Sequence, residues 1–233
     1  MSIYPWDIPM YSAATVGRLV GLTSGRVRRW LQGYEYTYSV GRVREMRKGH
    51  KEPVIRRTEA TVSIYASFLD LIDLLFVKRF LEHGLSLQKV RRALREAEEL
   101  LGDYHFARRS FFTDGENIYL QVRDNADALL ELMSGGQWAI ATIIKQLAHQ
   151  IDFDEPTGFA ERWYPLGQGG LVVLDPKIAF GQPTLIGRGI TTSNIYDFFL
   201  GEGEEVGHVC SWMNLKRQEV EAAVTFERQL AAA

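Results

Sequence analysis

Residues 10–30 carry the sequence MYSAATVGRLVGLTSGRVRRW, which predicts two short helices joined by a tight turn. In the first half, apolar residues recur at helical spacing, and Ser12 stands where a helix N-cap is expected. Gly21 supplies the turn, Thr23 can cap the second helix, and Gly33 can end it. Two short helices connected in this way are typical of a helix-turn-helix.

The second of these helices turns its arginines away from the expected core. At about 100° per residue, Val27 and Leu31 lie on one side and would pack against the first helix. The other side carries arginines beside the small Gly25, and arginine binds guanine edges and phosphates in the major groove of DNA. The DNA-binding residues that we expect on this helix are Thr23, Ser24, Gly25, Arg26, Arg28 and Arg29. The alternative is a structural network in which these arginines pair with acids such as Glu98 and Glu99.

Residues 34–57 form a basic segment in which we expect a β-wing, with tyrosines alternating at its start and glycines farther on. The wing residues that we expect to contact DNA are Arg42, Arg44, Arg47 and Lys48. Charge is divided unevenly, because residues 1–57 hold eleven Lys and Arg against four acids, whereas residues 58–233 hold sixteen against twenty-five. A basic segment with helical order favours a polyanionic partner, although a solvated basic face has the same composition.

The rest of the chain favours helices with small β-hairpins. An Asp-Gly pair within residues 111–120 predicts a hairpin, and the Gly- and Pro-rich run 155–170 is expected to be a connection. The other expected elements are a strand at 171–174 and helices at 67–82, 86–101, 136–150, 192–200, 204–213 and 216–230.

The predicted fold class is therefore mainly α with small β-hairpins. It comprises an N-terminal winged helix-turn-helix plus a C-terminal helical domain that is helix-turn-helix-like. The expected domain boundaries are residues 1–102 for the first domain and 171–233 for the last, with a possible partner-binding segment at 103–170.

Composition argues against several classes of protein. A chain of 233 residues with 46% hydrophobic residues can bury a core, and its single cysteine, Cys210, cannot form an internal disulfide. Neither a signal-peptide pattern nor a long apolar run occurs, so we expect a cytoplasmic protein without a membrane role. The histidines have no metal-ligand spacing, and the acids Asp152, Asp154 and Glu155 are interpreted as a solvated turn. We expect no enzyme, no metal and no cofactor.

Two stretches of the N-terminal half resemble MerR-type regulators. They are residues 10–30 and the sequence FLEHGLSLQKVR at 80–91, which occur in the family's order and at its separation. Together they cover about residues 10–100. The resemblance implies a winged helix-turn-helix, double-stranded DNA as a partner, and a homodimer.

A second resemblance covers the C-terminal part. The sequence DPKIAFGQPTLIGRGI at 175–190, followed by helices, resembles the domain-of-unknown-function family 433. Members of that family are similar to VapB-type antitoxins. The resemblance implies a type II antitoxin that neutralises a PIN-like ribonuclease toxin and represses its own operon by binding its own promoter. From the residues themselves we expect turns at the glycines of this stretch and a buried salt bridge at Arg188.

Aromatic residues near the acids of residues 152–155 form a candidate surface for the toxin. These partner-binding residues are Phe153, Phe159, Trp163 and Tyr164. Two other interpretations stay open. One is a stand-alone MerR-like transcriptional regulator, and the other is a protein or RNA interaction module that does not read duplex DNA.

Overall fold

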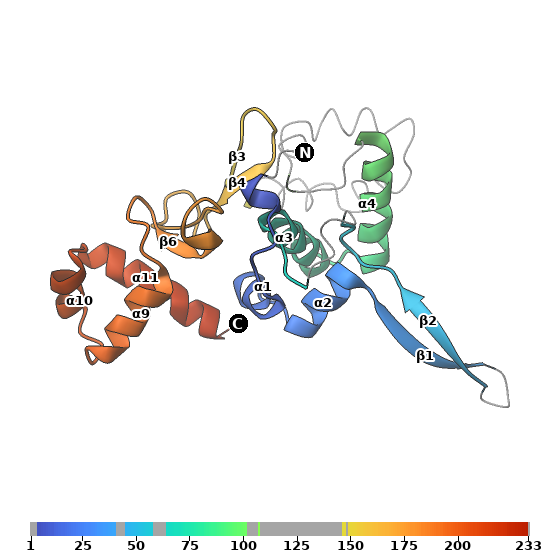
Figure 1. Cartoon of the computed structure of the whole chain (residues 1–233), viewed down its shortest axis with the longest axis horizontal. Helices are drawn as coiled ribbons and strands as arrows, with labels where there is room; N and C mark the ends of the chain where they lie inside the picture. Colours follow the sequence, from blue (N-terminus) through green and yellow to red (C-terminus); the bar gives the residue numbers. More distant parts are fainter. Residues whose placement is uncertain are drawn as a thin grey trace.

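The computed structural model describes residues 4–40, 45–57, 64–101, 107, 146–147 and 149–232. Helices from the two ends of the chain gather on opposite sides, and a small sheet lies between them (Figure 1). The α-helices are α1 (Ala13–Val20), α2 (Ser24–Gln32), α3 (Phe68–Glu82), α4 (Leu87–Leu101), α9 (Thr192–Gly201), α10 (Val206–Met213) and α11 (Arg217–Ala232). Short 3-10 helices are η1 (Pro5–Asp7) and η3 (Ala179–Gly181).

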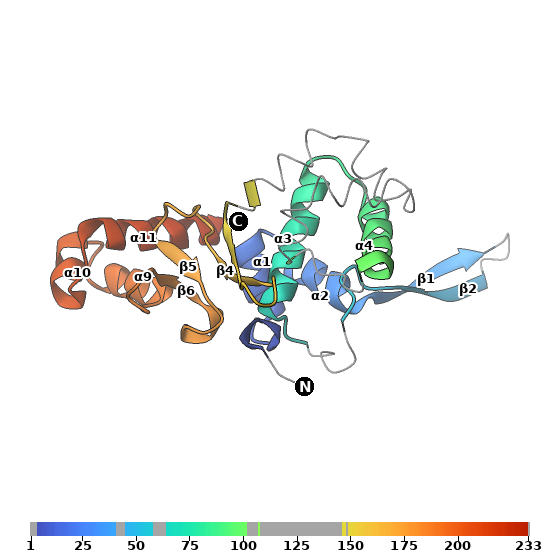
Figure 2. The same cartoon turned by 90° about the horizontal axis from the view of Figure 1, so that it is seen from above.

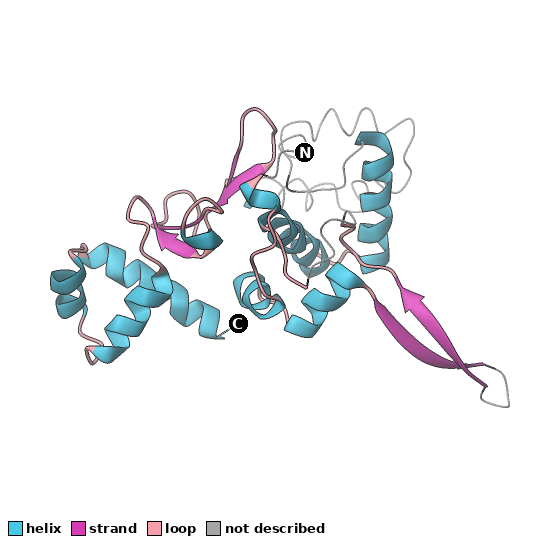
Figure 3. Cartoon of the chain, viewed as in Figure 1, coloured by secondary structure: helices cyan, strands magenta, loops and turns pink. Residues whose placement is uncertain are grey.

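The described strands form two antiparallel sheets, so the expectation of a mainly α protein with small β elements is confirmed (Figure 3). The first sheet pairs two strands, and the second has the order β3-β4-β5-β6. The strands are β1 (Tyr34–Val40), β2 (Glu45–Lys51), β3 (Ile151–Phe153), β4 (Ala160–Trp163), β5 (Val172–Leu174) and β6 (Pro183–Leu185).

Helices α1 and α2 begin and end where the sequence predicts. The Ser12 side chain accepts the backbone N–H of Thr15, and the Thr23 side chain accepts that of Arg26. Between the helices, Gly21 adopts the left-handed conformation at φ 66°, which a residue with a Cβ rarely adopts. The turn is therefore set by local capping chemistry.

The strands β1 and β2 form a hairpin that projects from the helices (Figures 1 and 2). Tyr36 is paired with Gly49 on the strand opposite, and the missing side chain of Gly49 leaves room for the ring, because a Cβ there would come within 2.6 Å of it. Arg42 and Arg44, which are expected in this wing, lie outside the described residues.

Helix α3 lies at the centre of the N-terminal half and is buried on nearly every side (Figure 1). It begins with a capping box, in which Ser67 and Asp70 each accept the backbone N–H of the other. The carboxylate of Asp70 also lies 3.0 Å from the guanidinium of Arg57, in the segment that follows the hairpin. This acid therefore ties the base of the hairpin to the central helix.

The second sheet corrects one expectation. Residues 155–170 were expected to be a connection, but they contain β4, which pairs with β3 on one side and β5 on the other. Ala160 and Trp163 at the ends of β4 are buried, so this short strand is held by its packing. The strands of the segments expected as 103–170 and 171–233 thus share one sheet.

One hydrophobic core continues from the N-terminal helices through this sheet to the last helix. It includes Val16 of α1, Trp163 of β4, Leu174 of β5 and Phe226 of α11. A second cluster fills the space among β6, α9, α10 and α11. The helices expected at 192–200, 204–213 and 216–230 are all confirmed, within a few residues at their ends.

Two expected elements lie outside the described residues: the hairpin at 111–120, and the helix at 136–150 apart from its last few residues. Among the helices that the structure describes, none combines the length and the hydrophobicity of a membrane-spanning segment.

Candidate functional site

Helix α2 presents three arginines to solvent, as the sequence predicts. Val27, Trp30 and Leu31 are buried on its inner side, against α1 and α3. The arginines on the outer side, Arg26, Arg28 and Arg29, are exposed, as is Gly25. This inward packing of the apolar residues fixes the direction in which the guanidinium groups point.

The arginines of α2 form no ion pair with any residue that the structure describes. Arg26 lies 5.9 Å from the ring centre of Trp30, and Arg29 lies 5.8 Å from that of Tyr34. Such contacts orient a guanidinium but leave its positive charge uncompensated. The side chains of Glu98 and Glu99 are not among those described, so the alternative network with these acids stays a prediction.

The amino-terminal end of α2 adds a second kind of donor. Thr23 is the N-cap, and Ser24 and Gly25 form the first turn, where backbone N–H groups have no partner within the helix. These groups and the helix dipole favour an anion at this end of the helix. The residues expected to bind DNA on this helix therefore lie together at its N-cap and within its first two turns.

The hairpin extends this basic surface. Arg47 and Lys48 of β2 are both exposed, and Arg47 lies 3.3 Å from Glu45 in a solvent-exposed ion pair. Exposed pairs of this kind are worth about 0–1 kcal/mol, so Arg47 can exchange its partner for a phosphate at little cost. Three tyrosines of β1 form a row along the same hairpin, with adjacent ring centres 6.1 and 5.7 Å apart.

A hollow connects α2 with the hairpin and α4. Its lining includes Arg26, Arg29, Trp30, Lys51 and Arg91, and its volume is about 350 Å³. Lys51 belongs to the basic segment expected as a wing but was not among the residues expected to contact DNA, and Arg91 was not expected at this surface. The spacing of charges on α4 is an ordinary helical pattern, and nothing local shows that Arg91 faces α2.

The aromatic residues expected to bind a partner are mostly part of the core. Trp163 is 4% exposed, and Phe153 and Phe159 are partly buried against the same cluster. Tyr164 is also partly buried and donates a hydrogen bond to Asp152 at 2.6 Å. Burial, followed by this hydrogen bond, raises the pKa of Tyr164 to about 12. Trp163 is therefore almost inaccessible to a partner in this conformation. The partner-binding role of the four residues stays a prediction.

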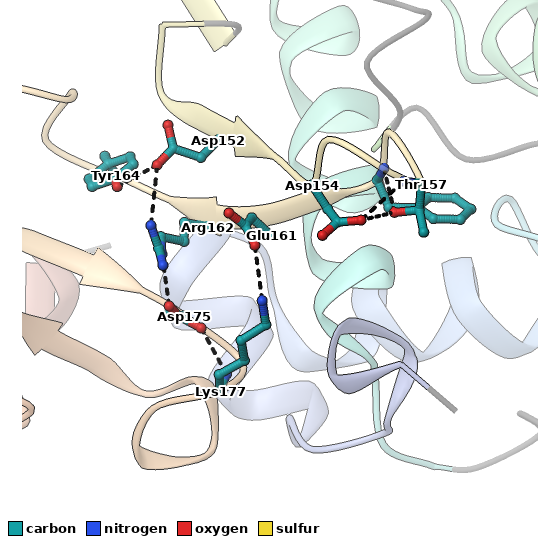
Figure 4. Close-up of polar contacts among 9 residues, drawn as sticks. Asp152, Asp154, Thr157, Glu161, Arg162, Tyr164, Asp175 and Lys177 are labelled. Carbon is teal, nitrogen blue, oxygen red and sulfur yellow. Dashed lines mark hydrogen bonds and ion pairs between the residues drawn. The ribbon is translucent and has the colours of Figure 1, made fainter. Parts of the chain in front are cut away.

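The acids beside these aromatic residues belong to a polar network across the sheet (Figure 4). Arg162 of β4 lies 2.8 Å from the buried Asp175 and 3.9 Å from Asp152. Its pKa is raised, chiefly by the hydrogen bond to Asp175. Lys177 lies 3.0 Å from Glu161 on the same strand. The network fastens β4 to the segments before and after it.

The expectation of a solvated turn at these acids therefore holds only in part. Asp154 closes a turn by accepting from the backbone and the hydroxyl of Thr157, whereas Asp152 is held in the network by Tyr164 and Arg162 (Figure 4). The acid and the phenol that pair here are twelve residues apart in sequence, so their contact depends on the β3–β4 pairing.

The glycine-rich stretch of the C-terminal part contains the expected turns. Arg188 forms the expected salt bridge, at 2.9 Å from Glu219, but its side chain is 37% exposed, so the expectation of a buried bridge is wrong. Gly181 does more than shape a turn, because its carbonyl accepts a buried hydrogen bond from Tyr11 at 2.8 Å. Among the residues that the structure describes, no cluster of His, Cys, Asp and Glu could hold a metal ion.

Similarities to known proteins extend along most of the chain. Residues 172–226 match the family described as "Protein of unknown function (DUF433)", which confirms the expected resemblance of the C-terminal part. Over 201 residues the chain is 22% identical to "Putative antitoxin VapB45" of Mycobacterium tuberculosis (strain ATCC 25618 / H37Rv), and the match covers 82% of each protein.

The fold itself recurs in a solved structure. The crystal structure of Rv2018 from Mycobacterium tuberculosis superposes with a TM-score of 0.67 at 17% sequence identity. The superposition covers 94% of this chain and 98% of that one. The arrangement of N-terminal helices, sheet and C-terminal helices is therefore shared as a whole. The resemblance of residues 10–100 to MerR-type regulators stays a prediction.

Proposed function

We propose that this chain is a DNA-binding antitoxin of a type II toxin–antitoxin system. In this role it neutralises a PIN-like ribonuclease toxin and represses the operon that encodes both proteins. The observation that carries the DNA-binding part is the exposed arginine side of α2, which lacks acidic partners among the described residues and lies beside a basic hairpin. The similarity to a protein named as an antitoxin, along 82% of both chains, supports the rest.

In this proposal, α1 and α2 with the hairpin act as a winged helix-turn-helix. Helix α2 enters the major groove with its amino-terminal end leading, and Arg26, Arg28 and Arg29 reach base edges or phosphates. Arg47 and Lys48 of the hairpin bind the neighbouring backbone, as do Arg42 and Arg44. A homodimer would present two such units to a promoter with two-fold symmetry, as dimeric helix-turn-helix proteins do.

The toxin-binding part of the proposal is assigned to the acidic remainder of the chain. Residues 58–233 carry a net negative charge, which favours a basic partner surface. Tyr164, Phe153 and Phe159 keep part of their surface exposed beside the polar network and are the accessible members of the aromatic set. This function needs no catalytic residue in the antitoxin, which acts in the cytoplasm by binding alone.

The DNA-binding part is tested with the full chain and a duplex of its own promoter. Fluorescence anisotropy across a salt series compares wild type with the Arg26→Ala/Arg28→Ala/Arg29→Ala variant. We expect a loss of at least about 3 kcal/mol and a shallower salt dependence, at about 1–3 kcal/mol for each base-reading arginine.

A matched control replaces with Ala three arginines elsewhere, Arg79, Arg217 and Arg228, whose side chains are 44%, 67% and 53% exposed. It has the same net charge as the α2 variant and should bind nearly as well as wild type. Equal binding by wild type and the α2 variant would refute the DNA-binding proposal and favour a protein or RNA interaction module.

The toxin-binding part is tested separately. A PIN-like protein encoded beside this gene is expressed alone and together with the chain, and growth and co-purification are measured. Rescue of growth with formation of a stable complex is expected. Tight promoter binding without any such complex would instead favour a stand-alone transcriptional regulator.

A further inference from the structure

A second hollow lies between the end of the hairpin and helix α4. Its volume is about 230 Å³, and its charged lining comprises His50, Lys51, Glu52, Arg56, Arg91 and Arg95. Lys51 and Arg91 also line the hollow beside Arg26 and Arg29 of α2. The two hollows are thus neighbours that share two cationic side chains.

The charge of this second hollow is strongly unbalanced. Four of the described lining residues are Lys or Arg, and the one acid among them, Glu52, is 80% exposed and lies 3.6 Å from His50. Lys51 of β2 and Arg91 and Arg95 of α4 therefore converge with little negative charge among the lining residues that the structure describes. On the solvated side of a single helix, charged side chains point apart into water. Here cations from separate elements face one common space.

Arg91 carries an unsatisfied donor among the residues that the structure describes. Its Nε is buried and has no hydrogen-bond partner among the residues that the structure describes. Burial is the main cause that lowers the pKa of Arg91, and the nearby charge of Arg95 lowers it further, against the opposite effects of Tyr34 and Glu52. A buried guanidinium donor beside a second arginine is stabilised when an anion occupies the space between them.

We propose that this hollow is a binding site for a phosphate group, with Arg91 and Arg95 as its guanidinium ligands and Lys51 as an additional point charge. Arginine donates in a planar fork that matches two phosphate oxygens, and several cations around one space suit the three oxygens of a phosphate better than the two of a carboxylate. The volume is below the roughly 300–1,000 Å³ of pockets that enclose whole drug-sized ligands. It fits a phosphate group whose remaining atoms lie outside.

This chemistry has two possible sources. The first is a backbone phosphate of DNA that is already bound by α2, and this source rests on the proposed function. The shared lining with the α2 hollow favours it, because one strand could pass from Arg29 to Arg91. The second source is free phosphate or a phosphorylated small molecule, which would bind whether or not the chain binds DNA.

The test uses the full chain and the variants Arg91→Gln and Arg95→Gln. Arg95 is exposed, so Arg95→Gln leaves the core intact. It therefore tests the site even if Arg91→Gln lowers the stability of the fold. The control is Arg217→Gln, which removes an exposed arginine of α11. In the first arm, Tm is measured in sodium phosphate and in sodium chloride of equal ionic strength.

At about ten times the dissociation constant of phosphate, linkage predicts a rise in Tm of roughly 3–5 °C for wild type and the control. The rise in Tm should be absent or much smaller in Arg91→Gln and Arg95→Gln. In the second arm, promoter-duplex affinity is measured from 50 to 200 mM salt. Loss of one phosphate contact lowers the slope of log affinity against log salt by about 0.9.

Each pattern of results has one meaning. A smaller slope of log affinity against log salt in both arginine variants supports the site, with DNA as the source of the phosphate. A lost rise in Tm with unchanged duplex binding supports the site with a free phosphate compound as its ligand. If Arg91→Gln and Arg95→Gln give the same rise in Tm and the same salt dependence as Arg217→Gln, the proposal is overturned. If wild type binds no duplex, the proposed function fails, and the thermal arm still decides whether the phosphate site exists.

Discussion

The buried ion pair between Arg57 and Asp70 decides whether the hairpin is held firmly to the helical core. The two groups lie 3.0 Å apart, with side chains that are 6% and 4% exposed. Asp70 also accepts the backbone N–H of Ser67 at 2.8 Å in the capping box of α3. The carboxylate of Asp70 thus caps the central helix and also neutralises the guanidinium of Arg57, which follows the proposed DNA-binding wing.

The substitution Asp70→Asn keeps the shape of this side chain and removes its charge. It leaves the guanidinium of Arg57 buried beside a neutral amide, and breaking a buried pair in this way costs about 3–5 kcal/mol. In a chain of this size, 1 kcal/mol corresponds to about 2–4 °C, so Tm should fall by roughly 6–20 °C.

The free energy of unfolding is measured by urea denaturation, and Tm by calorimetry, at neutral pH. Asp197→Asn, at an exposed position of α9, serves as the control and should change stability by less than about 0.5 kcal/mol. The double variant Arg57→Met/Asp70→Leu should recover part of the loss, because it removes both charges together. If Asp70→Asn costs no more than Asp197→Asn, the pair does not anchor the hairpin, and the reasoning is wrong.

Three further predictions concern the junction between the two ends of the chain. Tyr11→Phe removes the buried hydrogen bond to the carbonyl of Gly181 and should cost about 1–3 kcal/mol in urea denaturation, whereas an unchanged midpoint would mean that water replaces the phenol. Trp163→Ala should cost about 3–5 kcal/mol in urea denaturation because the ring lies in the core, so any loss of partner binding must be accompanied by this loss of stability. Because the pKa of Tyr164 is raised to about 12, its phenol stabilises the fold fully below pH 10 and loses this contribution as pH rises from 10 to 12. The stability difference between wild type and Tyr164→Phe should therefore shrink across that range, and a constant difference would contradict the raised pKa of Tyr164.

Local signals in the sequence account for the helices of the N-terminal half. Ser12, Thr23 and Ser67 each cap the helix that follows them, and the apolar periodicity of α1 and α2 predicts which sides are buried. The direction of the arginines on α2 follows from the same periodicity. This part of the candidate site could be predicted because it depends only on residues within one or two helical turns of each other.

The contacts that sequence reasoning missed join residues that are far apart in the chain. Strand β4 is only four residues long and lies within a run rich in Gly and Pro, so its local pattern indicates a loop, and only pairing with β3 and β5 makes it a strand. The bond from Tyr11 to Gly181 spans 170 residues. Arg91 reaches the α2 surface only because α3 and α4 pack as they do, a contact that no helical pattern contains.

The distribution of ion pairs separates structural arginines from the arginines of α2 that are proposed to bind nucleic acid. Arg57, Arg162 and Arg188 each contact a carboxylate within 3.0 Å, and each contact ties one segment of the chain to another. Arg26 and Arg29, in contrast, lie three residues apart on one helix without such a partner among the described residues. Like charges at this spacing destabilise a helix by about 0.2–0.5 kcal/mol per pair. A fold that neutralises its structural arginines and leaves this repulsion in place on an exposed helix end is best explained if an external polyanion supplies the missing negative charge.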